Sequence, residues 1–412
     1  MSDTSEKRPL EAPDLSDLDV EQTVLRLIEY AAGLPASDLF FLANESDAAI
    51  CVRHLGIVRP LMTVTREELS RYINHTKAIA GMAVDQRLRP LDGRCICGIE
   101  GGHRVDVRIN TIPTLWGEDM AVRLLAHDMT LLDLGNLGFH RQNLDHLMAL
   151  LSRPSGLILV TGPAGAGKTT TLYACLSHLN DGSRKINTIE EPIELAMAGI
   201  RQSEVRPRIG LGFPELIRSV LRQAPDVIMV GEIRDPVTAE TAVLAANSGH
   251  LVFATLHAPV AAGAVNSMLA LGANPHFLSA CLLGILSQRL VRRLCDECKV
   301  AFDLSGSPQT FDDVREWLEP GQGDHIYSSP GCEHCRFEGF TGRTGVAEVL
   351  RITRSIRELI HERRTTRDIR QKAVEEGMLD LRRSALLKVA QGLTSTEEVV
   401  RTIPTEHLLP DE

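Results

Sequence analysis

The pattern of apolar and polar positions changes once along this chain of 412 residues. Between residues 20 and 130, short apolar runs such as DLFFLA and AAICVRHLG predict strands. Helical spacing over 20–32, and again in a stretch that begins at Thr65, predicts two helices. The region is therefore predicted to be a small α+β domain. Residues 1–19 are polar and acidic, which favours a flexible lead-in.

From Leu144 onward the pattern repeats as strand, loop and helix. The runs GLILV, DVIMV and HLVFATL are nearly continuously apolar, which is typical of strands buried on both faces of a parallel sheet, and KINTIE is predicted as a further strand in the same repeat. We therefore expect an α/β fold with a parallel-rich sheet over residues 144–294, after a linker at 131–143. Residues 341–412 are expected to form a C-terminal helical region.

Composition narrows the class of protein. The formal net charge of −10 argues against a nucleic-acid partner, because a surface that follows phosphates needs a basic excess. The N-terminus has no apolar core of the kind that signal peptides carry. The most apolar stretch, 251–291, is interrupted by polar residues, so no transmembrane segment is predicted. The expectation is a cytoplasmic protein.

A phosphate-binding loop follows the first apolar strand. Gly162, Gly167, Lys168 and Thr169 satisfy the pattern G-x-x-x-x-G-K-[ST] between a predicted strand and a predicted helix. Backbone amides of such a loop surround phosphate oxygens, while the lysine reaches the β- and γ-phosphates and the threonine hydroxyl holds Mg²⁺. The guanine-reading pattern N-K-x-D is absent, which favours ATP. The predicted nucleotide-binding residues are Gly162, Pro163, Ala164, Gly165, Ala166, Gly167, Lys168, Thr169 and Thr170.

Two carboxylates and a histidine stand at the ends of later strands. Glu190 ends KINTIE, Glu232 follows DVIMV, and His257 follows HLVFATL. Because strand ends on the carboxyl side of a parallel sheet face the ligand, all three are predicted to converge with Lys168. Each one taken alone is more often a solvated loop residue, but their joint order behind the phosphate loop is hard to explain by chance. The common Mg²⁺-steering Asp after the apolar run is replaced by Gly231, so the sequence leaves open whether the strand serves catalysis.

The cysteines divide into two groups. Cys295, Cys298, Cys332 and Cys335 form two C-x-x-C pairs, which predicts a closed, structural Zn²⁺ site within residues 295–340. A redox dithiol is the alternative, and His334 is expected to be a bystander. The remaining cysteines are predicted to be ordinary apolar or half-exposed residues, with Cys95 and Cys97 on opposite sides of a strand. These cysteines are Cys51, Cys95, Cys97, Cys175 and Cys281.

Taken together, these motifs resemble the secretion ATPases of type II secretion and type IV pilus assembly, the GspE/PilB-like family. The resemblance spans residues 20–405 and includes TGPAGAGKTTT, TIEEPIE, LRQAPDVIMVGEIRD, GHLVFATLHA, QRLVRRLCDEC, GRTGVAEVL and GMLDLRRSALLKVAQGLTSTEEVV. It implies a RecA-like P-loop ATPase domain preceded by a small PAS-like domain. In this family Gly-Glu closes the strand, so Glu232 would polarise the attacking water, Glu190 would support Mg²⁺ and His257 would sense the γ-phosphate.

The resemblance also implies partners. Arg108 and Arg123 in the small domain would contact the nucleotide, and the protein would work as a homo-hexamer under an inner-membrane platform protein. The tetracysteine module favours an assembly motor, because retraction motors of the family generally lack it. The alternatives are a ring scaffold without turnover, a related secretion or conjugation ATPase, a retraction motor and a nucleic-acid motor.

Several positions differ from the family pattern. Ala224 stands where an acidic residue is usual, and Glu191 replaces an Asp. The segment ASDLFFLANE departs from the family's acidic, His-containing segment. Because only residues 1–19 precede the small domain, we expect either a different way of docking on the membrane partner or membership of a shorter subgroup, such as those that serve DNA-uptake pili.

Overall fold

The computed structural model describes the chain except for residues 1–9, 35, 99–103, 126–128 and 409–412. The described residues form two compact units. The smaller contains those within 1–127 together with 336–338, and the larger contains those within 128–335 and 339–412.

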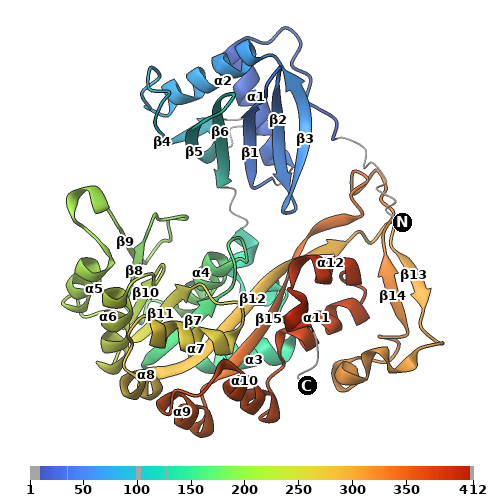
Figure 1. The fold of residues 1–412 in the computed structure, drawn as a ribbon. Helices are drawn as coiled ribbons and strands as arrows, with labels where there is room; N and C mark the ends of the chain where they lie inside the picture. The colour runs from blue at the N-terminus through green and yellow to red at the C-terminus, as the bar shows by residue number, and fades with distance from the viewer. Residues whose placement is uncertain (1–9, 35, 99–103, 126–128, 409–412) are drawn as a thin grey trace. The chain divides into compact units, whose positions relative to one another are not determined.

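The smaller unit is an antiparallel sheet with helices packed on one face (Figure 1). In spatial order its strands are β3 (Ile57–Val64), β2 (Ala48–His54), β1 (Asp38–Ala43), β6 (Gly117–Leu125), β5 (Arg104–Thr114) and β4 (Leu91–Gly98). The helices are α1 (Val20–Gly33) and α2 (Arg66–Ile79). Asp19 and Thr65 cap these helices through capping boxes, which is why the chain enters each helix at that residue.

Two predictions for this unit need correction. Residues 1–9 of the predicted flexible lead-in lie outside the described residues, but Leu10 is buried in the core of this unit and the Tyr30 hydroxyl donates to the Glu11 carbonyl. Cys95 and Cys97 do not face opposite sides of β4, since their sulfur atoms lie 3.8 Å apart. Residues two apart on a strand share a face, and the earlier prediction misapplied that period.

The larger unit is built on a seven-stranded sheet in which all neighbours are parallel except β15 and β12. In spatial order its strands are β15 (Phe340–Arg351), β12 (Leu282–Leu294), β7 (Gly156–Thr161), β11 (Leu251–Leu256), β10 (Val227–Val230), β8 (Ile186–Glu190) and β9 (Arg201–Glu204). The four strands predicted in the strand, loop and helix repeat are β7, β8, β10 and β11. The sheet is the predicted parallel-rich α/β arrangement.

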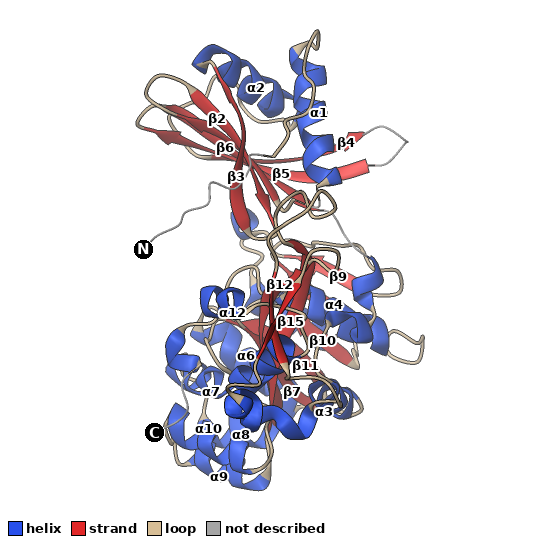
Figure 2. Cartoon of the chain, turned by 90° about the vertical axis from the view of Figure 1, so that its right-hand side faces the viewer, coloured by secondary structure: helices blue, strands red, loops and turns tan. Residues whose placement is uncertain are grey.

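Helices cover both faces of this sheet (Figure 2). Side chains of β7 alternate between two cores, with Leu157 and Leu159 in one and Ile158 and Val160 in the other. The first core is completed by α5 (Phe213–Leu221), α6 (Pro236–Asn247), α7 (Ala261–Ala270), α8 (Pro275–Cys281), α9 (Arg354–His361) and α10 (Thr366–Glu375). The second is completed by α3 (Arg141–Leu151) and α4 (Lys168–Leu179). Burial on both faces explains the continuous apolar runs.

The C-terminal part of the chain differs in one respect from the predicted helical region 341–412. That region begins with the strand β15, and its helices start only at Arg354. Its last two helices, α11 (Leu381–Ala390) and α12 (Thr396–Thr402), pack against β12 and β15 around a third core. Between β12 and β15 the chain forms a two-stranded sheet of β13 (Val300–Asp303) and β14 (His325–Ser328) and a helical turn, η5 (Pro308–Trp317).

The short elements are 3₁₀ turns. They are η2 (Met129–Leu132), η3 (Leu134–Leu137), η4 (Pro207–Ile209) and η6 (Thr405–His407). The first two occupy the predicted linker 131–143, whose last residues already begin α3. No helix within the described ranges has both the length and the apolar character that crossing a membrane requires.

Candidate functional site

The loop between β7 and α4 has the geometry of a phosphate cradle. Its residues Pro163, Ala164, Gly165 and Thr169 are exposed, and Gly167 caps α4 without any side-chain hydrogen bond to the helix amides. Gly162 has a φ of +147°, and a Cβ there would lie 2.5 Å from the Gln288 carbonyl oxygen, so only glycine fits. The amides at the N-terminus of α4 therefore remain directed at a surface where an anion binds well.

Lys168 lies over this loop. Its Nζ donates to the carbonyl oxygens of Gly162 at 2.8 Å and Pro163 at 3.0 Å. Burial lowers the pKa of Lys168, and the negative charge of nearby Glu232 opposes that shift. Lys168 and Glu232 are therefore close enough for their charges to interact.

Gln288 on β12 holds the same loop and the start of α4 through side-chain hydrogen bonds. It is buried; its Nε2 donates to the Ala166 carbonyl at 2.7 Å, and its Oε1 accepts from the Thr171 hydroxyl at 2.8 Å. The neighbouring Arg289, also buried, donates to the Pro259 carbonyl at 2.7 Å. One strand thus ties the phosphate loop to the segment that follows His257.

Gly231 allows the strand β10 to turn directly into Glu232. Its amide donates to the Ile189 carbonyl at 2.8 Å, and an added Cβ would lie only 3.1 Å from that oxygen. A side chain at this position would press on the backbone of β8. Close packing between two strand ends accounts for the glycine that the sequence pattern left unexplained.

Glu232 and His257 meet at the end of the sheet. The Oε1 of Glu232 lies 2.7 Å from Nε2 of His257, and its Oε2 accepts from Arg234 Nε at 2.7 Å. The hydrogen bond from Arg234 to Glu232 raises the pKa of the guanidinium. Arg234 also contacts Glu191 at 3.1 Å, so the longer carboxylate that replaces the family's Asp has a defined partner. The arrangement brings a carboxylate and an imidazole into contact at the ends of β10 and β11, and β11 is next to β7, the strand that leads into the phosphate loop.

Glu190 lies in a different environment from Glu232. Its side chain is buried and accepts hydrogen bonds from Thr188 Oγ1 at 2.5 Å, from Gln202 Nε2 at 3.1 Å and from the Tyr173 hydroxyl. Burial, together with this bond, raises the pKa of Tyr173, so the phenol remains a donor. Glu190 therefore belongs to a buried network that fixes the end of β8. Its neighbour Glu191 is the exposed member of the pair.

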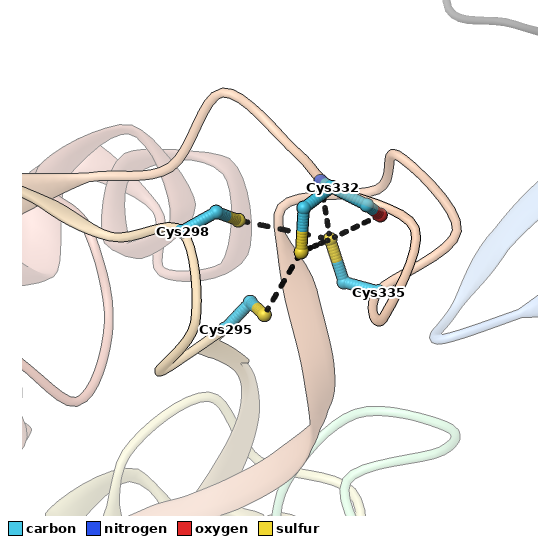
Figure 3. A group of neighbouring side chains, drawn as sticks. All are labelled: Cys295, Cys298, Cys332 and Cys335. Carbon is cyan, nitrogen blue, oxygen red and sulfur yellow. Dashed lines mark hydrogen bonds between the residues drawn. The ribbon is translucent and has the colours of Figure 1, made fainter.

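Four cysteines gather where β12 ends and β15 begins (Figure 3). Their sulfur atoms lie within 4.8 Å of one another, with separations of 3.9 Å for Cys295–Cys332 and 3.8 Å for both Cys298–Cys335 and Cys332–Cys335. A tetrahedron of thiolates about 2.3 Å from a zinc ion has edges of about 3.8 Å. Backbone amides of Cys332 and Gly339 donate to Cys335 Sγ at 3.1 and 3.2 Å, which suits a thiolate. The donor set and spacing fit Zn²⁺.

Comparison with known proteins identifies a family for this chain. A family model described as "Type II/IV secretion system protein" matches residues 14–401. The chain belongs to this family. The type II secretion system ATPase E of Vibrio cholerae is 40% identical over 392 residues, which cover 94% of this chain and 77% of that protein. The type IV pilus assembly ATPase PilB of Pseudomonas aeruginosa is 37% identical over 388 residues, covering 94% and 68%. The protein is an ATPase of the type II secretion and type IV pilus kind.

Solved structures agree with this secretion ATPase in fold. The pilus retraction motor PilT with bound ADP matches with a TM-score of 0.61 and 26% identity, over 94% of this chain and 97% of PilT. The ATPase DotB of Legionella pneumophila matches with a TM-score of 0.68 and 20% identity, over 95% and 97%. The second likeness concerns the fold alone.

In the smaller unit of the secretion ATPase, the two arginines that the resemblance singled out stand side by side. Arg108 on β5 and Arg123 on β6 are paired directly across the two strands. Arg123 Nε contacts Asp38 Oδ1 at 3.1 Å, and Arg53 Nε contacts the other oxygen of Asp38 at 3.3 Å. Their strand register puts all four residues on one face of the sheet.

Sequence reasoning missed several residues of the secretion ATPase site. Gln288, Arg234 and Tyr173 make the contacts described above. Gln288 and Tyr173 lie outside the motifs that they support, whereas Arg234 stands two residues after Glu232 within LRQAPDVIMVGEIRD but was given no role. Gln288 and Tyr173 are buried polar residues on elements that read as apolar, and that mismatch was the available signal. Of the predicted residues, the structure brings Glu232 and His257 into contact, while Glu190 has buried partners of its own.

Proposed function

We propose that this protein is a Mg²⁺-dependent motor that hydrolyses ATP as a ring of six copies and powers the assembly of a type II secretion pseudopilus or a type IV pilus-like filament. The observation that carries the proposal is the 2.7 Å contact between Glu232 and His257. Both residues follow strands at the same edge of the sheet as the phosphate loop. A scaffold that only binds nucleotide has no use for a carboxylate and an imidazole held in this way.

In the larger unit, the residues of the phosphate loop would take the roles that they have in a RecA-like ATPase domain. The loop residues Gly162 to Thr170 would hold the triphosphate, with Lys168 on the β- and γ-phosphates. The exposed Thr169 hydroxyl would hold Mg²⁺, which supplies positive charge to the transferring phosphoryl group when it is bound. Phosphate oxygens are stronger acceptors than the two loop carbonyls that Lys168 contacts, so we expect Lys168 to exchange them for ATP.

Glu232 is the proposed catalytic carboxylate. It would orient the attacking water and accept its proton, and His257 would respond to the γ-phosphate by turning from Glu232 toward it. Both oxygens of Glu232 accept from cationic or polar donors, so one of these contacts has to open first. Glu190, with its Tyr173, Thr188 and Gln202 bonds, would act by holding the end of β8 in place for Mg²⁺ or its waters.

The smaller unit would complete the site when it closes on a nucleotide. Its PAS-like sheet presents Arg108 and Arg123 side by side on one face, and the side chain of Arg123 is 65% exposed. Two arginines paired across neighbouring strands on one face suit the binding of a polyphosphate. Rotation of one unit against the other would then convert ATP binding and release into movement.

The tetracysteine cluster supports structural zinc and, through the resemblance, an assembly motor. With four protein ligands, no coordination position is left for water, so the site would brace the β12–β15 junction. An inner-membrane platform protein is the proposed docking partner, and the protein would act in the cytoplasm at the membrane surface. The related retraction motor PilT shares the fold, so this function depends on the module and on a direct test.

The test is ATP turnover by the full chain and by Glu232→Gln, with oligomer mass and zinc content measured on the same samples. We expect slow, Mg²⁺-dependent hydrolysis that rises with assembly, and a loss of at least about 10²-fold in kcat for Glu232→Gln with ATP binding retained. Glu240→Gln, an exposed carboxylate on α6, is the matched control and should leave kcat unchanged.

Three results would overturn parts of this proposal. Binding of ATP without turnover, in a hexamer with a membrane partner added, would support the scaffold instead. Equal hydrolysis by wild type and Glu232→Gln would move the catalytic role to Glu190. A monomer that hydrolyses ATP at the full rate would show that hydrolysis does not need a ring of six copies.

A further inference from the structure

We infer that Thr255 is a positioning residue for Glu232, an assignment that rests on the proposed function. Thr255 is the penultimate residue of β11, and only 4% of it is exposed. Its Oγ1 donates to the Gly231 carbonyl at 2.5 Å, and its own carbonyl accepts from the Ile233 amide at 2.9 Å. These two bonds fall on either side of Glu232. Thr255 therefore fixes both peptide groups that set the direction of the Glu232 side chain.

The turn that carries Glu232 is also held from its other side. The Gly231 amide donates to the Ile189 carbonyl at 2.8 Å, so the backbone is clamped between β8 and β11. With both neighbours fixed, the Glu232 carboxylate reaches His257 at 2.7 Å. Because His257 is only two residues beyond Thr255, the two groups share one short strand end and keep their relative position when that end moves.

A second threonine continues this arrangement toward the phosphate loop. Thr161 is the last residue of β7 and immediately precedes Gly162. Its hydroxyl donates to the Ala258 carbonyl at 2.9 Å and accepts from the Ala258 amide at 2.8 Å. Hydrogen bonds from two threonines thus connect the phosphate loop, the His257 segment and the Glu232 turn. A movement of the loop on binding ATP would reach Glu232 through Thr255.

The alternative is that the Thr255 hydroxyl only satisfies a buried carbonyl. A structural role of that kind would lower stability and leave the turnover of the folded enzyme unchanged. A positioning role would lower kcat and leave ATP binding intact, because the phosphate loop and Lys168 make no use of Thr255. The two roles therefore differ in how kcat and KM respond.

Thr255→Val separates the two roles, since it removes the hydroxyl at nearly constant volume and keeps the backbone bond to Ile233. We expect kcat to fall roughly 10- to 100-fold, the effect of a small displacement of a catalytic group. The KM for ATP should change less than about 2-fold if binding is untouched, and Thr255→Ser should recover most of the kcat because it restores the hydroxyl.

Thr394→Val is the matched control. Thr394 is fully buried and its Oγ1 donates to the Arg292 carbonyl at 2.8 Å, so the substitution breaks the same kind of bond elsewhere in the unit. We expect a decrease in Tm comparable to that of Thr255→Val and no change in kcat. Hydrogen exchange at Ile233 gives a readout that needs no turnover, and exchange there should accelerate in Thr255→Val and stay slow in Thr255→Ser.

The outcomes distinguish the two proposals. Wild-type kcat in folded Thr255→Val, or no recovery in Thr255→Ser, would overturn the role of Thr255 while leaving the motor intact. Absence of turnover in the wild type would defeat the motor proposal, and unchanged exchange at Ile233 in Thr255→Val would then overturn the positioning role as well.

Discussion

The Nε2 of His257 lies 2.7 Å from Oε1 of Glu232, so the imidazole and the carboxylate touch across the ends of two neighbouring strands. Arg234 occupies the other carboxylate oxygen at 2.7 Å. A carboxylate that has to accept a proton from water needs one of these oxygens. The side chains of both partners are exposed, 58% for His257 and 60% for Arg234, so exposure alone does not decide which one leaves. The proposed response to the γ-phosphate makes His257 the partner to test first.

The first prediction concerns His257→Ala. If His257 both holds Glu232 and responds to the γ-phosphate, kcat should fall by about 10²-fold while ATP binding changes little. Steady-state kinetics and a fluorescent nucleotide titration would check both parts. His334→Ala, an exposed histidine between two cysteines, should retain wild-type kcat. A loss of ATP affinity equal to the loss in kcat would instead make His257 a binding residue.

The second prediction concerns Gly231→Ala. The added Cβ would lie 3.1 Å from the Ile189 carbonyl and 3.4 Å from Glu190 Cα, so β8 and the Glu232 turn have to separate slightly. We expect the unfolding free energy to fall by about 1–3 kcal/mol, as in other overpacked sites, and kcat to fall with it. Urea unfolding and turnover would be measured on the same preparation.

Gly263→Ala is the control for that substitution. Gly263 lies in α7, where an added Cβ makes only ordinary contacts of 3.5 Å or more. Alanine in a helix interior is favoured over glycine by roughly 1 kcal/mol, so this variant should be as stable as wild type or more so. If both alanine variants were equally active and stable, close packing at Gly231 would not be the reason for its glycine.

How far the sequence predicts this protein depends on whether a feature is local. The phosphate loop is local: a strand, a run of glycines and a helix start follow each other directly, and the structure has them in that order. The strands β7, β10 and β11 were predicted from apolar runs, because both of their faces are buried.

The sequence did not predict features that depend on partners far away in the chain. The 13 residues of β12 include Gln288, Arg289 and Arg292, which read as polar interruptions but are buried. Arg292 is paired with Glu398, 106 positions later, and no local pattern reveals this pairing. Likewise, strand position alone did not show that the Glu190 side chain has buried partners of its own.

The third prediction concerns the metal. Purified protein should contain one zinc ion per chain, and Cys332→Ser should reduce the zinc content and lower the unfolding free energy by about 4 kcal/mol or more, because loss of a structural metal is among the largest single-site effects. Elemental analysis and thermal unfolding with and without a chelator would measure this. Cys95→Ser, a half-buried thiol in the smaller unit, should keep its zinc. If the protein without zinc unfolded at the same temperature as the protein with zinc, the metal would have no structural role, and the redox dithiol alternative would stand.

The fourth prediction concerns the stability of the C-terminal region in acid. Glu398 is buried; burial by itself would raise its pKa, but hydrogen bonds from Arg401 and Arg292 outweigh that effect and hold the pKa at about 2, below its ordinary value of 4.5. Such a carboxylate stabilises the fold fully above its unfolded pKa. This contribution, on the order of 3 kcal/mol, should be lost as the pH falls from about 4.5 toward 2.

Urea unfolding at a series of pH values tests this directly. Wild type should lose stability below about pH 4.5 more steeply than Glu398→Gln, which has no proton to take up at this site. At neutral pH, Glu398→Gln should be less stable by about 3–5 kcal/mol, because Arg292 is left buried without its counter-charge. The exposed neighbour Glu397 offers the control, since Glu397→Gln should follow the wild-type curve. Parallel pH curves for wild type and Glu398→Gln would mean that other carboxylates govern acid unfolding, and that the Arg292–Glu398 pair adds no pH dependence to the fold.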